Sequence, residues 1–207
     1  MTDHFRTQYE KFYDSDEYYW GTEPGDFLER LTALKPPSPE IRVLDIGCGE
    51  GKDAVYMAQL GYSVTAFDLT ESGIRKTLRL ARERGVQINA FRADINDFKL
   101  DGPFDIIYST GTVQYLQDEN IPGFFEKVKG LTAPNGLNYF NVFVEKPFLA
   151  LPPDWDMEEK MWKTGALFAH YADWKIRFID ETIFEDHSGG ISHFHCMDVL
   201  LAEKIAD

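Results

Sequence analysis

The chain has 207 residues, of which 43% are hydrophobic and 27% charged, so it can form one domain with a substantial core. Its formal net charge of −14 excludes nucleic acids and anionic lipid surfaces as expected partners, because binding to phosphate depends on lysine and arginine. The start of the chain lacks the apolar core of a signal peptide, and no later stretch approaches eighteen apolar residues. We therefore expect a single cytoplasmic domain over residues 1–207.

The first forty residues are predicted to be an N-terminal helical segment, with short helices over 2–14 and 26–34. Between these helices the chain is rich in aromatic residues, including Tyr18, Tyr19 and Trp20. Two interpretations stay open. The aromatic side chains could be ordinary packing, or the segment could be a lid in which Trp20 covers a bound ligand and excludes water.

A glycine-rich stretch follows the first predicted strand. The apolar run Ile41 to Ile46 ends in glycines at positions 47, 49 and 51, and a helical stretch over 52–60 follows at once. Glycine lets the backbone turn sharply and lie against a ligand, so we expect free N–H groups of the loop to face that ligand. The second apolar run, 62–67, ends in Asp68, whose carboxylate can accept hydrogen bonds from a ribose diol. The stretch predicts a site for a nucleoside-containing cofactor.

The acid before this loop helps to choose among cofactors. The sequence over 45–51 is D-I-G-C-G-E-G, whereas dinucleotide folds favour G-x-G-x-x-G. It resembles the (D/E)-x-G-x-G-x-G motif of class I S-adenosylmethionine-dependent methyltransferases. An acid here suits a cofactor with a sulfonium and an ammonium group and would repel a pyrophosphate. The alternative is a glycine-rich turn that binds NAD or FAD, with Asp68 as the acid that contacts the ribose. The resemblance implies that the methionine part and the ribose are held by Asp45, Gly47, Gly49, Gly51, Asp68 and Leu69.

The next two predicted strands carry further candidates. The strand over 87–93 ends at Asp94 and Ile95, where the methyltransferase pattern places an acid and an apolar residue against the adenine. The alternative is that Asp94 caps the next turn. The strand over 104–108 leads into Ser109 and Thr110, which we expect to line the cofactor site, because ligands bind at the carboxyl ends of parallel strands.

Two polar residues follow that strand. Gln114 and Tyr115 could reach the methyl acceptor, or they could be polar groups at a helix start.

The remaining pattern fixes the expected fold class. A helix over 121–131, a turn over 134–136, a fifth strand and a helix over 166–174 precede two β-like runs, 175–184 and 191–201, which form a hairpin. In the earlier helix over 71–84, Leu78, Leu80 and Ala81 are expected to face inward. The order predicts a Rossmann-like α/β fold: a seven-stranded, mostly parallel sheet with an antiparallel last strand, a C-terminal β-hairpin and helices on both faces.

Motifs spread over the chain resemble the tellurite-resistance (TehB-like) group of small-molecule methyltransferases. They include Y-x-W-G-x-E-P-x-x-F-L near the start, I-P-G at 121–123 and G-x-L-x-x-x-Y-x-x-W at 165–174. The resemblance implies methyl transfer from S-adenosylmethionine to a small-molecule acceptor, such as a thiol, a chalcogen oxyanion or another heteroatom, with S-adenosylhomocysteine as product. The alternative is a non-catalytic S-adenosylmethionine-binding sensor or partner protein. A monomer or a homodimer is expected.

The last hairpin departs from that group. Tellurite-handling relatives place arginine after the histidine that matches His187, where this chain has Ser188, so tellurite need not be the substrate. His187, His193 and His195 are the best titratable candidates at the acceptor, and the last two share one face of a strand. They could hold an anionic acceptor, deprotonate a neutral one, bind a metal or be half-exposed hairpin residues. Because H-x5-H-x-H matches no established zinc spacing, no metal site is predicted.

Overall fold

The computed structural model describes residues 2–153, 160–187 and 190–206, and within them seven strands form one sheet. The strand order is β3-β2-β1-β4-β5-β7-β6. The first five positions of this order are parallel, whereas β7 runs antiparallel to both β5 and β6. The predicted sheet is confirmed. The strands are β1 (Arg42–Ile46), β2 (Ser63–Asp68), β3 (Asn89–Arg92), β4 (Phe104–Ser109), β5 (Thr132–Phe143), β6 (Lys175–Asp186) and β7 (His193–Glu203).

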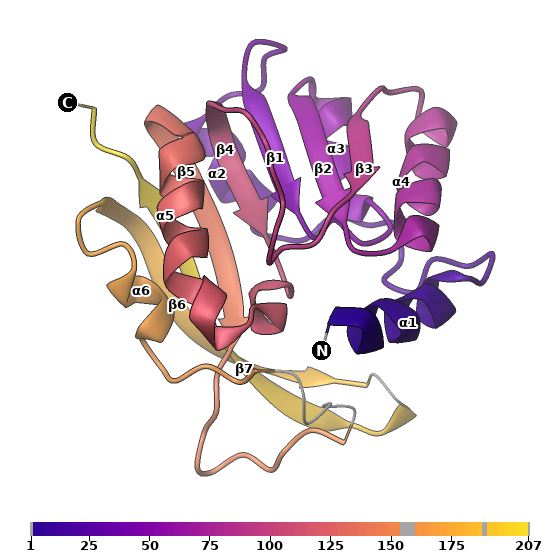
Figure 1. The fold of residues 1–207 in the computed structure, drawn as a ribbon, viewed down its shortest axis with the longest axis vertical. Helices are drawn as coiled ribbons and strands as arrows, with labels where there is room; N and C mark the ends of the chain where they lie inside the picture. The colour runs from indigo at the N-terminus through magenta and orange to yellow at the C-terminus, as the bar shows by residue number, and fades with distance from the viewer. Residues whose placement is uncertain (1, 154–159, 188–189, 207) are drawn as a thin grey trace.

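Helices cover both faces of the sheet (Figure 1). One core lies between the sheet and α5 and α6, and the other between the sheet and α2, α3 and part of α4. None of the helices in the described ranges is both long and apolar enough to cross a bilayer. The helices are α1 (Thr2–Tyr13), α2 (Leu28–Leu34), α3 (Lys52–Leu60), α4 (Glu71–Glu83), α5 (Ile121–Leu131) and α6 (Ala166–Ala169), with 3₁₀ turns η1 (Val113–Tyr115) and η2 (Asp118–Asn120).

The central strands read as continuous apolar runs because both of their faces are buried. In β1, Val43 packs into the core under α2 and α3, while Leu44 and Ile46 pack into the core under α5. All three side chains are fully buried. The carboxyl ends of β1, β2 and β4 are thereby held at one edge of the sheet, which is where the site lies.

Two segments extend past this edge (Figure 1). Helix α1 lies beyond the ends of β2 and β3, and the β6–β7 hairpin projects beyond the end of β5. In the hairpin, Asp186 pairs with His193, and Phe184 pairs with His195. Chain segments from the two termini therefore flank the same edge.

Four local predictions were wrong. Helix α2 begins at Leu28 rather than residue 26, and Leu78 is 39% exposed, although Leu80 and Ala81 are buried as expected. Residues 134–136 lie inside β5, as an irregularity in which Asn135 has φ +57°, rather than forming a separate turn. The helix over 166–174 stops at Ala169, because the chain then turns tightly to bury Tyr171 and Trp174 under α5.

Candidate cofactor and acceptor site

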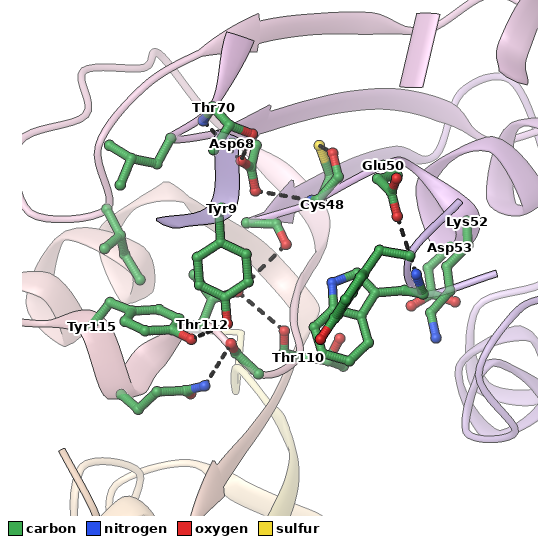
Figure 2. Close-up of a pocket in the computed structure, with 18 of the residues that line it drawn as sticks. Tyr9, Cys48, Glu50, Lys52, Asp53, Asp68, Thr70, Thr110, Thr112 and Tyr115 are labelled. Atoms are coloured by element: carbon green, nitrogen blue, oxygen red, sulfur yellow. Dashed lines mark hydrogen bonds between the residues drawn. The ribbon is translucent and has the colours of Figure 1, made fainter. Parts of the chain in front are cut away.

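A cavity of about 690 Å³ lies at the carboxyl ends of the central strands (Figure 2). One end is lined by the glycine loop after β1 and by Asp68 at the end of β2. The other end is lined by Phe143 of β5, Phe184 of β6 and His195 of β7. Its size suits one or two small molecules, and its two ends differ in chemistry.

Three N–H groups of the glycine loop are hydrogen-bonded within the protein rather than directed at the cavity. The N–H groups of Gly47 and Cys48 donate to the Phe67 carbonyl at 2.8 and 2.9 Å, and the Gly49 N–H donates to Asp68 Oδ2 at 2.9 Å. The expectation of free loop N–H groups is therefore wrong for these residues. A loop with its donors already used and carboxylates beside it favours a cationic ligand over a phosphate.

Close packing explains two of the three loop glycines. A Cβ on Gly47, whose φ is +74°, would lie 2.1 Å from Thr112 Oγ1. A Cβ on Gly51 would lie 2.7 Å from the Thr77 side chain, and Gly51 is not among the residues that line the cavity. Gly49 does line it, beneath the aromatic residues of the N-terminal segment.

Asp45 is a deeply buried acid at this end, with 2% of its surface exposed. It lies in β1 and lines the cavity. Burial raises its pKa well above the ordinary carboxyl value, and the nearby charges of Asp53 and Asp68 raise it further. A positively charged ligand group beside Asp45 would relieve this repulsion.

Asp68 joins the end of β2 to the glycine loop. Its Oδ2 accepts the Gly49 N–H, and its Oδ1 accepts the N–H and hydroxyl of Thr70 at 2.9 and 2.6 Å (Figure 2). Burial raises its pKa, although these hydrogen bonds oppose the rise. Oδ2 accepts only one of these hydrogen bonds, so its second lone pair can still accept a hydroxyl group of a ligand. Leu69 lines the cavity beside it.

Not all of the predicted cofactor residues after β3 and β4 line the cavity. Asp94, Ile95 and Thr110 line the cavity. Asp94 Oδ1 also accepts the Asn96 N–H at 2.8 Å, so its alternative role as a turn cap is present as well. Ser109 is fully buried and donates to the Ile46 carbonyl at 2.9 Å, which ties β4 to β1 outside the cavity lining.

The N-terminal segment is fastened over the glycine loop. The Trp20 N–H donates to Glu50 Oε2 at 3.1 Å, and its indole donates to the Tyr13 hydroxyl at 2.9 Å. Glu50 is buried and forms an ion pair with Lys76 at 2.7 Å. Trp20 lines the cavity and is 45% exposed. This position fits the lid interpretation.

Acids hold the rest of this segment. Glu10 of α1 accepts the N–H groups of Glu71 and Ser72 at the start of α4, at 2.7 and 3.0 Å. Partial burial would raise the pKa of Glu10, but these backbone hydrogen bonds and the nearby charge of Arg75 outweigh it and lower the pKa. Asp53 of α3 accepts the Gly25 N–H at 2.8 Å. The segment is thus held at three points by carboxylates.

Two residues of η1, Gln114 and Tyr115, line the cavity. The hydroxyl of Tyr115 is hydrogen-bonded to that of Tyr9 in α1, and Figure 2 shows the two pointing toward each other. Gln114 is buried and donates to the Gly111 carbonyl at 2.7 Å. Its Oε1 has no hydrogen-bond partner among the described residues. Tyr115 therefore links the N-terminal segment to η1, while Gln114 offers a buried acceptor.

The three hairpin histidines also differ in whether they line the cavity. His195 is buried and lines the cavity, and its Nε2 lies 2.9 Å from His193 Nε2. His193 is buried behind it, so the prediction that the two share a face is confirmed. The His187 side chain is 72% exposed and does not line the cavity. Of the three, only His195 lines the end of the cavity formed by β5, β6 and β7, which is called the acceptor end below.

A family model described as "Tellurite resistance protein TehB" matches residues 5–191, which is most of the chain. The chain belongs to the TehB family. The predicted resemblance to TehB-like S-adenosylmethionine-dependent methyltransferases is thereby confirmed.

Curated relatives carry related names. "Probable S-adenosyl-L-methionine-dependent methyltransferase TehB" of Haemophilus influenzae is 26% identical over 84% of this chain and 59% of its own length. "Malonyl-[acyl-carrier protein] O-methyltransferase" of Pectobacterium atrosepticum is 31% identical over 69% of this chain and 54% of its own. The chain thus spans little more than half the length of these relatives.

Solved structures share the fold of this TehB-family chain. The crystal structure of TehB from Haemophilus influenzae superposes with a TM-score of 0.77 at 23% identity, covering 96% of this chain and 66% of that one. Magnesium protoporphyrin IX methyltransferase (ChlM) from Synechocystis PCC 6803, solved with bound SAM, has a TM-score of 0.65 at 17% identity, covering 98% and 82%.

Several site residues of this TehB-family chain were not predicted. Glu50 and Asp53 hold the N-terminal segment, and their signal was the presence of acids within and just after the glycine loop. Tyr9 and Asp186 reach the cavity from elements distant in sequence, so no local motif marks them. These residues all depend on tertiary contacts.

Proposed function

We propose that this chain is an S-adenosylmethionine-dependent methyltransferase that acts on a small-molecule acceptor, with cofactor and acceptor held at opposite ends of one cavity. The observation that carries the proposal is the continuity of the cavity. It joins an acidic end, with Asp45 and Asp68, to an aromatic end with His195. A binding protein for the cofactor alone would have no need of the second end.

The acidic end fits the parts of this cofactor. Asp45, buried and repelled by neighbouring carboxylates, would stabilise the cationic methionine part. Asp68, fixed by Gly49 and Thr70, would accept a ribose hydroxyl at Oδ2. Asp94 and Ile95, after β3, would contact the adenine, and Thr110, after β4, would line the cofactor site. Bound there, the cofactor would supply an electrophilic methyl group on a sulfonium and leave as S-adenosylhomocysteine.

The protein would act mainly by positioning and by excluding water. Trp20 and Tyr9 lie over the cavity and are held by contacts to Glu50 and Tyr115. A closed, dry cavity keeps water from competing for the methyl group and holds the acceptor in line. Gln114 Oε1, buried at the cavity wall, would accept a hydrogen bond from a bound molecule. Tyr115 would border the acceptor.

The aromatic end suggests the kind of acceptor. Phe143, Phe184 and Met197 give it apolar and polarizable walls, which suit sulfur or a heavier chalcogen. His195 and Asp186 supply its polar groups. We therefore favour a thiol or a chalcogen oxyanion, whose lone pair would form the new bond to the methyl carbon as the bond between that carbon and the sulfonium sulfur breaks. A thiol acceptor would first release its proton to solvent.

The test is formation of S-adenosylhomocysteine with a panel of thiols, selenite, tellurite, thiopurines and small amines. We expect turnover with at least one thiol or oxyanion. Calorimetry of cofactor binding accompanies it, and Asp68→Asn should weaken that binding by about 1–3 kcal/mol because charge-assisted hydrogen bonds are lost. Asp97→Asn is the control, because Asp97 is exposed and does not line the cavity. Tight binding without turnover across the panel would favour the sensor alternative.

A further inference from the structure

The β6–β7 hairpin places three metal-ligand side chains in one cluster. Asp186, the last residue of β6, pairs directly with His193, the first residue of β7, and residues opposite each other in an antiparallel pair share a face. His195 follows two positions later on that face. One ligand atom from each residue lies within 4.8 Å of the others, and both histidines are buried. Strand register, rather than a local motif, creates the cluster.

A backbone contact aims one imidazole at the cluster centre. His193 Nδ1 lies 2.7 Å from the Ile191 carbonyl oxygen. A carbonyl only accepts, so Nδ1 carries the proton, and Nε2 of the neutral ring presents its lone pair toward His195. Metal-binding histidines are commonly oriented in this way, through a hydrogen bond from the second ring nitrogen. His195 is held between aromatic rings, with centroids 4.9 Å from Phe143 and 5.7 Å from Phe184.

The distances suit a shared cation. The Nε2 atoms of His193 and His195 are 2.9 Å apart. Two nitrogen ligands about 2.0–2.1 Å from one ion and at right angles to each other would lie about 2.9 Å apart. Asp186 Oδ2 lies 3.6 Å from His195 Nε2, so its carboxylate is within reach of the same ion. Its negative charge would offset the ion's charge in a partly buried place.

We propose that Asp186, His193 and His195 bind one divalent first-row transition-metal ion, such as Zn²⁺ or Fe²⁺, at the acceptor end of the cavity. Two imidazoles and one carboxylate leave coordination positions open, as in catalytic metal sites. Because Asp186 and His195 line the cavity, those positions face the acceptor space. The site revises the expectation of no metal: it uses Asp186 and excludes the exposed His187.

The ion would bind and activate the acceptor. A thiol that coordinates a transition metal loses its proton and is held as a thiolate, and an oxyanion would be held through its oxygen. This role rests on the proposed methyltransferase function, whereas ion binding itself does not. The bound ion would also give this acidic protein a positive charge with which to hold an anionic acceptor.

The experiment is metal binding to the full chain without an affinity tag, after removal of metal with a chelator. Zn²⁺ is titrated by calorimetry and Co²⁺ by its visible absorption. We expect one ion per chain, with His195→Gln or His193→Gln weakening Zn²⁺ binding more than about 100-fold, since even outer hydrogen-bond partners affect affinity 10–100-fold. Asp186→Asn, at the partly exposed member, should weaken it about tenfold, and thermal unfolding confirms that each variant folds.

The matched control is His187→Gln, which removes a histidine on the same hairpin but outside the cluster and should leave Zn²⁺ binding unchanged. Absence of Zn²⁺ binding by the wild type, or equal binding by wild type and the His193→Gln/His195→Gln double variant, would overturn the site. Turnover is measured separately on the same preparations. One ion bound without turnover of any acceptor would refute the proposed function and leave the metal site standing. Turnover by protein that binds no ion would refute the metal site alone.

Discussion

The two ends of the cavity are built in different ways. The acids and the glycine loop of the cofactor end come from one continuous stretch of chain, β1 to β2, whose loop is shaped by left-handed glycines and tied to Asp68 by a backbone hydrogen bond. The acceptor end comes from side chains of three strands, and Tyr9 of α1 and Tyr115 of η1, which share a hydrogen bond, also line the cavity. A local stretch encodes the first end, whereas strand register and docking of the N-terminal segment create the second. The cofactor end should therefore respond most to backbone changes, and the acceptor end to side-chain changes.

The largest expected effect tests the backbone origin of the cofactor end. Gly47→Ala would place a Cβ 2.1 Å from Thr112 Oγ1 at a φ of +74°, so overpacking adds to backbone strain. We expect a loss of about 3–5 kcal/mol in the free energy of unfolding, measured with denaturant. Gly61→Ala is the control, because Gly61 has φ +106° but no atom within 4 Å of the Cβ that alanine would add, and should cost only about 1–2 kcal/mol. Equal costs at the two positions would contradict the packing argument.

A smaller effect separates function from stability at the same end. Asp45→Asn should weaken S-adenosylmethionine binding by about 1–3 kcal/mol, because a charged partner of the ammonium group is lost. Without cofactor the variant should be more stable than the wild type. The folded-state pKa of Asp45 is raised, so the wild type loses stability as the pH rises through that pKa, and the advantage of Asn should grow with pH. Thermal unfolding of both proteins across a range of pH measures this difference in stability. A difference that does not depend on pH would refute the buried-charge account.

The smallest effect concerns the contact between the lid and η1. Removing one hydroxyl by Tyr9→Phe or Tyr115→Phe should cost about 0.5–1.5 kcal/mol of unfolding free energy, which is typical of one hydrogen bond. A double-mutant cycle isolates the pair, and we expect the two losses not to add. Strictly additive losses would show that the two hydroxyls do not act together, and that other contacts hold α1 over the cavity.

The sequence predicted the parts whose signals are local. The strand, glycine loop and helix over 41–60 and the hairpin could be located from apolar runs and glycine positions, and Asp68 from its distance after Gly47. Ser109 could not be distinguished from Thr110, because burial against the Ile46 carbonyl depends on how β4 sits beside β1. Asp186 gave no signal beside His187, since only the register Asp186 to His193 shows which of the two points inward. The loop donors were misjudged because their partners, Phe67 and Asp68, lie on the next strand.

The central claim is that Asp45 and Asp68 hold the methionine and ribose parts of S-adenosylmethionine at one end of a cavity whose other end receives the acceptor. The most direct test is a crystal structure of the chain with S-adenosylhomocysteine bound. We predict the ribose hydroxyls within hydrogen-bonding distance of Asp68, the amino group on the Asp45 side of the glycine loop, and the sulfur directed toward His195. A ribose turned away from Asp68, or a sulfur directed away from the hairpin, would contradict the account.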